Sequence, residues 1–118
     1  MNYRDNQIIQ HVNKHYGELL DEMKNIKSYE DFIKADNKYL QKAISFDILQ
    51  IGENLTHLSN ESANQINSRD LEGIVDTRNI VVHGYAVVKE KLIYKSIIED
   101  LPRLMTQINN IKWCKSSK

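Results

Sequence analysis

An arginine, a histidine and a tyrosine lie close together in the stretch RNIVVHGY, at Arg78, His83 and Tyr85. Histidine is the side chain best suited to move protons near neutral pH. Arginine carries a planar fork that can hold a phosphate group at two points. Together they would suffice to cleave RNA without a metal, because the nucleophile is the substrate's own 2′-hydroxyl. In that chemistry the arginine stabilises charge on the phosphate oxygens, and the histidine serves as general acid or base.

The residues before Gly84 predict an amphipathic helix from about 69 to 83 that carries these side chains. Its stripe consists of Leu71, Ile74, Arg78, Val81 and Tyr85. Arg78 is a cation within an apolar stripe, so it needs an anionic partner, a water-filled cleft or a ligand. Asn79 shares a helix face with His83, four residues on, whereas Arg78 lies about 140° away around the axis. Gly84 is expected to end the helix and to place the Tyr85 hydroxyl nearby.

A purely structural role is the alternative, and the spacing alone favours it. His83 would then cap the helix end, and Arg78 would pair with Glu53 or Asp76. Glu53 continues an apolar face of an earlier helix, so it is either the anion that Arg78 needs or a surface group beside a glycine.

The other histidines give weaker signals. His11 and His15 have a spacing that could bind a metal, but no third ligand lies near them in the sequence. Polar neighbours predict that His15 faces solvent, and His57 is interpreted in the same way. We therefore expect neither a metal site nor a cofactor.

The composition is that of one ordinary globular domain spanning residues 1–118, of which 41% are hydrophobic and 27% charged. The charges of the 16 basic and 16 acidic side chains cancel, so the formal net charge is zero. This argues against binding nucleic acid through overall positive charge, but it leaves room for a local basic site. A single cysteine, Cys114, excludes an internal disulfide and favours a reducing compartment. Without an apolar signal core or a membrane-spanning run, the chain is expected to be soluble and cytoplasmic.

The pattern of apolar residues predicts an all-α, antiparallel helical bundle, because glycine, proline and alternating strand patterns are sparse. Pro102 predicts a kink near Ile98 to Asp100 in the last helix, and residues from about 115 to 118 resemble a frayed tail. The expected helices span about 5–24, 29–35, 37–58, a short helix capped by Ser59 or Asn60, 69–83 and 89–113.

The third expected helix has two apolar faces. One face contains Leu40, Ile44, Ile48, Ile51, Leu55 and Leu58, and the other Tyr39, Ala43, Phe46 and Leu49. A helix that is apolar on two sides is covered on two sides, so one cover is the core and the other could be a second subunit. Gly52, in mid-helix, would be explained by a close helix crossing.

The stretch RNIVVHGY resembles the motif of the HEPN ribonuclease toxins. In that motif four residues separate an arginine from a histidine, and one further residue separates the histidine from a tyrosine. The chain is similar to the HepT-like branch over nearly its whole length. "AISFDILQIGENLTHLS" resembles the central helix of that branch, with its Gly-Glu pair at Gly52 and Glu53, and "IIEDLPRLMTQI" resembles its final helix with the internal proline.

The resemblance implies a homodimer in which Arg78 and His83 of both subunits line a shared cleft, with Asn79 and Glu53 as supporting residues. It implies metal-independent cleavage of RNA by the toxin half of a toxin–antitoxin pair. It also implies a partner, a minimal nucleotidyltransferase antitoxin of the MntA type, which transfers AMP onto Tyr85. Two alternatives remain: a non-catalytic nucleotide-binding or adaptor subunit of such a transferase, which would need Arg78 but not His83, and a purely structural dimeric bundle, which would need none of the motif residues.

Overall fold

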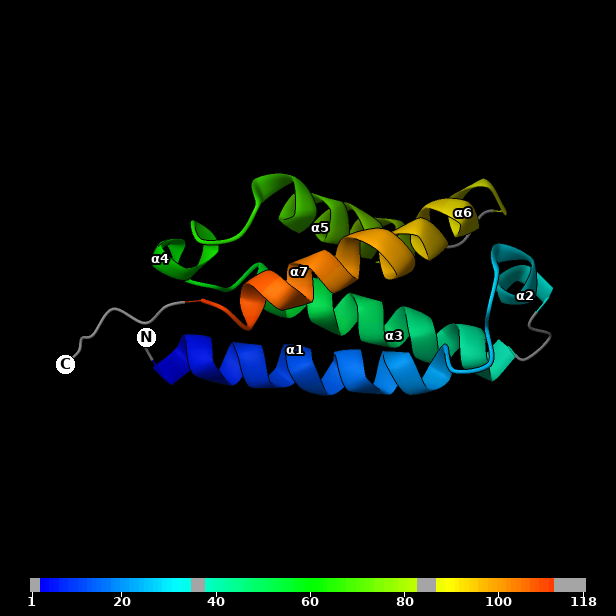
Figure 1. Cartoon of the computed structure of the whole chain (residues 1–118), viewed down its shortest axis with the longest axis horizontal. Coiled ribbons are helices and arrows are strands. Elements are labelled where there is room, and N and C mark those ends of the chain that lie inside the picture. Colours follow the sequence, from blue (N-terminus) through cyan, green and yellow to red (C-terminus); the bar gives the residue numbers. More distant parts are fainter. Residues whose placement is uncertain (1–2, 35–37, 83–86, 112–118) are drawn as a thin grey trace.

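The computed structural model describes residues 3–34, 38–82 and 87–111, and every regular element in these ranges is a helix (Figure 1). This confirms the predicted all-α fold. The elements are α1 (Tyr3–Glu22), α2 (Tyr29–Lys34), α3 (Lys38–Leu55), α4 (Asn60–Ala63), α5 (Ser68–Val82), α6 (Val87–Lys95), η1 (Ser96–Asp100) and α7 (Leu101–Ile108).

The long helices α1 and α3 run antiparallel, with α5 on the side of α3 away from α1 (Figure 1). Each turns an apolar stripe inward, because side chains spaced three and four residues apart share one helix face. The apolar residues that recur every three or four positions in the first and last helices are mostly buried. The buried residues of these two stripes are Ile8, Val12, Leu19, Met23, Ile93, Ile97, Leu101, Leu104, Ile108 and Ile111.

Helix α3 is central because it packs against both α1 and α5. Of its first predicted apolar face, Ile44, Ile48, Ile51 and Leu55 are buried, as the pattern predicted. On its second face Phe46 remains 52% exposed, whereas the Tyr39 side chain lies outside the described residues. Ala43 and Leu49 of this face are half-buried, so Phe46 is the large apolar side chain that the described part of this face leaves exposed.

The last predicted helix is continuous through α6, η1 and α7, and η1 is a π-helical turn. Proline has no backbone N–H, so Pro102 cannot make the usual bond to a carbonyl four residues earlier. The wider turn absorbs this defect, since the backbone N–H of Leu101 donates to the carbonyl of Ser96, five residues earlier. The sequence predicted a kink over these residues, and the structure places a π turn there.

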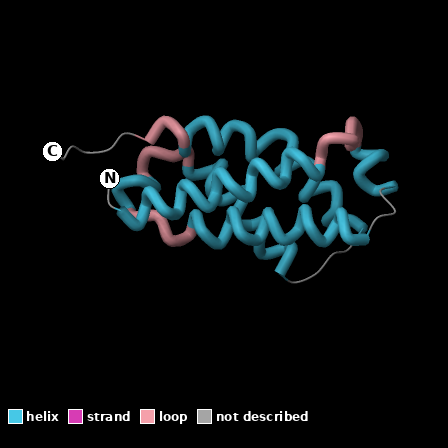
Figure 2. The backbone as a smooth tube through the Cα atoms, turned by 90° about the horizontal axis from the view of Figure 1, so that it is seen from below, coloured by secondary structure: helices cyan, strands magenta, loops and turns pink. Residues whose placement is uncertain are grey.

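Two short helices close the ends of the bundle, as Figure 2 shows from below. Helix α2 begins with a capping arrangement of Ser28 and Asp31. The Asp31 backbone N–H donates to Ser28 Oγ over 3.2 Å, and the Asp31 carboxylate accepts from the backbone N–H of Lys27 over 3.0 Å. Ser59, one of the two predicted caps, begins α4.

A buried carboxylate ties α4 to the start of α1. Asp5 accepts the backbone N–H of Ser59 over 3.0 Å and the hydroxyl of Ser62 over 2.7 Å, and it also accepts the Ser59 hydroxyl. Burial would raise the pKa of Asp5, but these hydrogen bonds prevail and hold the pKa below its ordinary value of 3.8.

Replacing Asp5 by asparagine should lower the free energy of unfolding at pH 7 by about 1–3 kcal/mol, because the amide cannot accept all three donors. A lowered folded-state pKa contributes stability above the unfolded pKa, and that contribution is lost as the pH falls through the folded value. The difference between wild type and Asp5→Asn should therefore shrink below about pH 4. Urea denaturation at pH 7 and pH 3 tests this, and an equal difference at both pH values would contradict it.

The observed helix bounds lie within a few residues of the predicted ones. Four predicted ends, at 35, 37, 83 and 113, lie outside the described residues, as do Cys114 and the predicted tail. Among the described helices, none combines the length and the apolar character needed to cross a membrane.

Candidate active site

Helices α3 and α5 come into close contact at Gly52, which is the explanation that the sequence analysis gave for this mid-helix glycine. A Cβ atom on Gly52 would lie 2.6 Å from Cβ and 2.9 Å from Cγ of Arg78. The crossing needs a residue without a side chain, and it presses the base of the Arg78 side chain directly against the α3 backbone. The arginine is thus fixed at its Cβ and Cγ, which leaves only the outer part of the side chain to adjust.

Gly52→Ala should therefore destabilise the protein by about 1–3 kcal/mol through overpacking, although alanine favours a helix by about 1 kcal/mol. Gly17→Ala is the matched control, because a Cβ there meets nothing within 4 Å. It should stabilise α1 slightly. Thermal denaturation of both variants checks the prediction, and equal stabilisation by the two alanines would show that the crossing is not tight.

The Arg78 guanidinium is held by two side chains. Its Nη2 donates to the Glu53 carboxylate in a short ion pair, and its Nη1 donates to Asn79 Oδ1 over 2.7 Å. Its Nε is buried and has no hydrogen-bond partner among the described residues. The Arg78 side chain is 28% exposed. Its charged group therefore lies within an apolar stripe of α5 but still reaches the surface at its outer edge.

These contacts resolve one of the alternatives that the sequence left open. Glu53 is the anion beside Arg78, and Asp76 is exposed and is not among the arginine's described partners. Glu53 also lies 3.5 Å from Nε2 of the exposed His57. The structure thus brings Glu53, Arg78 and Asn79 together. His83, Gly84 and Tyr85 lie outside the described residues, and α5 is described up to Val82.

A second face of α5 is fixed by a hydroxyl pair that the sequence did not reveal. Thr77 Oγ1 lies 2.7 Å from Ser96 Oγ in η1 and donates to the Gly73 carbonyl over 2.8 Å. Arg103 and Gln107 of α7 donate to the Asp70 carboxylate. Such bonds fix the rotation of α5, and therefore the direction in which Arg78 points.

The prediction that His15 faces solvent is wrong. His15 is only 9% exposed, its Nδ1 lies 2.9 Å from Asp47 Oδ1, and its ring meets the edge of Phe46 at a centroid distance of 5.7 Å. The neighbouring Glu22 is also partly buried. Burial is the largest cause that raises the pKa of Glu22 to about 8, and the neighbouring Asp47 and other nearby acidic side chains raise it further towards that value. His57, by contrast, is exposed as predicted.

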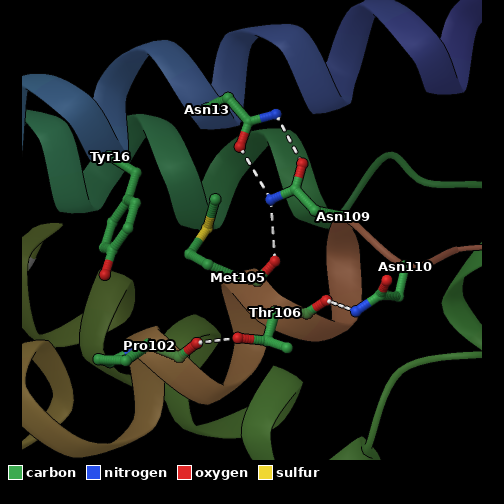
Figure 3. A pocket seen from close by; sticks show the side chains of 7 residues that line it. All are labelled: Asn13, Tyr16, Pro102, Met105, Thr106, Asn109 and Asn110. Atoms are coloured by element: carbon green, nitrogen blue, oxygen red, sulfur yellow. Dashed lines mark hydrogen bonds between the residues drawn. The ribbon is translucent and has the colours of Figure 1, made fainter.

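A separate groove of about 500 Å³ lies between α1 and α7 (Figure 3). Asn13 and Asn109 face each other across it and exchange two amide hydrogen bonds of 3.0 and 3.1 Å. No lining residue carries a charge, so the groove offers a phosphate nothing comparable to Arg78. The groove is lined by Asn13, Tyr16, Pro102, Met105, Thr106, Asn109 and Asn110.

Known proteins resemble this chain over most of its length. The chain is 26% identical over 103 residues to the protein named "Putative RNase TTE0752" of Caldanaerobacter subterraneus subsp. tengcongensis. The aligned region covers 87% of this chain and 89% of the relative. No solved structure matches the chain significantly. The family model described as "Ribonuclease HepT-like" matches residues 13–111, which include α3, α5 and the whole Arg78 site. The chain therefore belongs to the HepT-like ribonuclease family.

Proposed function

We propose that the protein is the toxin of a toxin–antitoxin pair and cleaves RNA without a metal, with Arg78 and His83 as its catalytic residues. The observation that carries this proposal is the placement of Arg78. It is anchored at its base by the Gly52 crossing, oriented at its tip by Glu53 and Asn79, and left partly exposed five residues before a histidine. An arginine with this support is preorganised for a phosphate, since little side-chain freedom is left to lose on binding.

In the proposed reaction the 2′-oxygen of one nucleotide attacks the adjacent phosphorus, and the bond from phosphorus to the 5′-oxygen of the next nucleotide breaks. The 2′-hydroxyl gives up its proton to a base, and the departing 5′-oxygen receives a proton from an acid. His83, together with its copy in a dimer, would supply these two functions. Arg78 would stabilise the charge that collects on the non-bridging phosphate oxygens. The products are a 2′,3′-cyclic phosphate and a free 5′-hydroxyl.

Glu53 and Asn79 act as positioning residues in this proposal. The carboxylate of Glu53 keeps the guanidinium in place and balances its charge while the site is empty. Because Glu53 is itself partly exposed, it can rotate away when a phosphate takes over one edge of the fork. Asn79 holds the other terminal nitrogen, Nη1, through a neutral acceptor, so this contact does not compete with the phosphate for charge.

The direct test is cleavage of a short single-stranded RNA by the purified protein in excess EDTA. We expect cleavage to continue and the new ends to be 2′,3′-cyclic phosphates, which mass spectrometry of the fragments identifies. A strict requirement for a divalent ion, or 3′-hydroxyl ends, would contradict the mechanism. Failure to cleave any RNA while binding a nucleotide would favour the adaptor alternative.

The proposal includes a two-fold dimer, the commonest form of soluble oligomer. Phe46 supports it, because a large aromatic side chain that is half exposed on α3 is one that a second copy could cover. Light scattering at micromolar concentration should give the mass of a dimer, and Phe46→Glu should shift the mass towards that of a monomer. A wild-type protein that is monomeric at this concentration would exclude a cleft shared between subunits.

We further propose that a minimal nucleotidyltransferase antitoxin neutralises the toxin by transferring AMP to Tyr85. The motif places this tyrosine two residues after His83, so the modification would lie beside the catalytic pair.

A further inference from the structure

A second polar cluster lies between α1 and α3, away from the Arg78 site. His15 and Glu18 occupy one turn of α1, and Asp47 faces them from α3. Asp47 precedes Glu53 by six residues, which is about 9 Å along the helix axis. The three side chains are not part of the arginine site and are unexplained by RNA cleavage.

The geometry of this cluster matches a metal centre. One donor atom from each of the three residues lies within 4.8 Å of the other two. His15 Nδ1 lies 2.9 Å from Asp47 Oδ1 and 3.6 Å from Glu18 Oε2. Zinc–ligand bonds of about 2.0–2.1 Å in a tetrahedron put neighbouring donors about 3.3–3.5 Å apart. The two distances from His15 Nδ1 bracket this value and the third pair lies within 4.8 Å, so side-chain movements of about an ångström would complete the site.

The carboxylates around His15 lack the partners that burial normally requires. Asp47 is 1% exposed, and its Oδ2 has no hydrogen-bond donor among the described residues. The Oε1 atom of the adjacent Glu22 is likewise buried and unpartnered. Buried carboxylate oxygens are normally hydrogen-bonded or bound to a cation. Two carboxylates, those of Glu18 and Asp47, thus lie beside one imidazole nitrogen, and a divalent cation would balance their charge and bind the open Asp47 oxygen.

We propose that His15, Glu18 and Asp47 bind one divalent transition-metal ion, and that this ion fastens α1 to α3. A nitrogen donor beside carboxylates favours zinc or manganese over magnesium and calcium, which prefer oxygen ligands alone. The Phe46 ring lies at the edge of the imidazole and shields it on one side. The ion is structural, because it joins two helices and lies apart from the residues proposed for catalysis.

The test is titration of chelator-treated full-length protein with Zn²⁺, followed by calorimetry and thermal denaturation, with Mg²⁺ as the comparison ion. We expect one Zn²⁺ per chain at this site and, at 100 times Kd, a rise in Tm of about 10 °C. Glu18→Gln should weaken binding by more than about 100-fold, because even outer-shell partners contribute about 10–100-fold. Since the Glu18 side chain is 45% exposed, this variant should fold normally. Asp47→Asn should weaken binding similarly.

Matched controls separate this site from other histidines. His11→Ala removes an exposed imidazole from the same helix, and His83→Ala removes the proposed catalytic one; both should retain the Zn²⁺ site unchanged. The proposal is overturned if wild-type protein shows no Zn²⁺-dependent rise in Tm. It is also overturned if Glu18→Gln and Asp47→Asn bind Zn²⁺ as tightly as wild type. The first result would mean that Glu22 and Asp47 share a proton instead. RNA cleavage in EDTA, measured well below Tm, reports separately on the proposed function.

Discussion

His83→Ala should lower the rate of RNA cleavage by about 10²–10⁴-fold while leaving thermal stability close to that of wild type, because the variant removes proton transfer and little else. The matched control is His57→Ala. That histidine is exposed beside Glu53, so its loss tests whether any imidazole near the arginine suffices. Initial rates on one RNA, with circular dichroism of each variant, provide the measurement. Full activity of His83→Ala would exclude the proposed mechanism.

Arg78→Ala should cause a loss of about 10²–10³-fold for a different reason, since it removes the group that stabilises phosphate charge. Arg78→Lys then separates charge from shape. A lysine keeps the cation but cannot bridge Glu53, Asn79 and a phosphate through a planar fork, so it should recover only part of the rate. If the wild-type protein binds RNA without cleaving it, and binding falls in Arg78→Ala but not in His83→Ala, the protein is a phosphate-binding adaptor.

Much of the bundle could be predicted from the sequence, because helix stripes depend on spacing alone. The buried residues of α1, α3 and α7 follow the periodic pattern, and the capping box at Ser28 and the crossing at Gly52 depend on local residue types. The π turn at Ser96–Asp100 was harder to predict, because a proline forces a defect without specifying its form.

The burial of His15 could not be predicted from the sequence. His15 lies beside Lys14 and near Glu18, so its own helix looks polar at that point. Its burial depends on how α3 lies against α1, which brings Asp47 and Phe46 over the imidazole. That relation joins residues more than thirty positions apart and has no local signal. Glu53 and Asp76 both remained candidate anions for Arg78 in the sequence, and the packing of α3 against α5 at Gly52 is what brings the Glu53 carboxylate to the guanidinium.

Tyr85→Phe should produce a toxin that its antitoxin cannot neutralise. In the proposed modification the Tyr85 hydroxyl oxygen attacks the α-phosphorus of ATP, the bond to the outer phosphates breaks, and pyrophosphate leaves as the phenol loses its proton. Phenylalanine has no acceptor oxygen, so this reaction cannot occur. The variant should remain toxic when the transferase is co-expressed, provided that RNA cleavage does not itself need the hydroxyl, which the cleavage assay on purified Tyr85→Phe determines.

The expected inhibition has a physical cause in the Arg78 site. An AMP group on Tyr85 would bring a phosphodiester close to a guanidinium that is already oriented, and would occupy with charge and bulk the place that an RNA phosphate needs. Tyr94→Phe is the control, because it removes a tyrosine hydroxyl from a different place. The Tyr94 ring packs against the rings of Tyr29 and Phe32. Peptide mass spectrometry of co-expressed protein should find AMP on Tyr85 in wild type and in Tyr94→Phe. A neutralised toxin that carries no AMP on Tyr85 would mean that the antitoxin acts by binding alone.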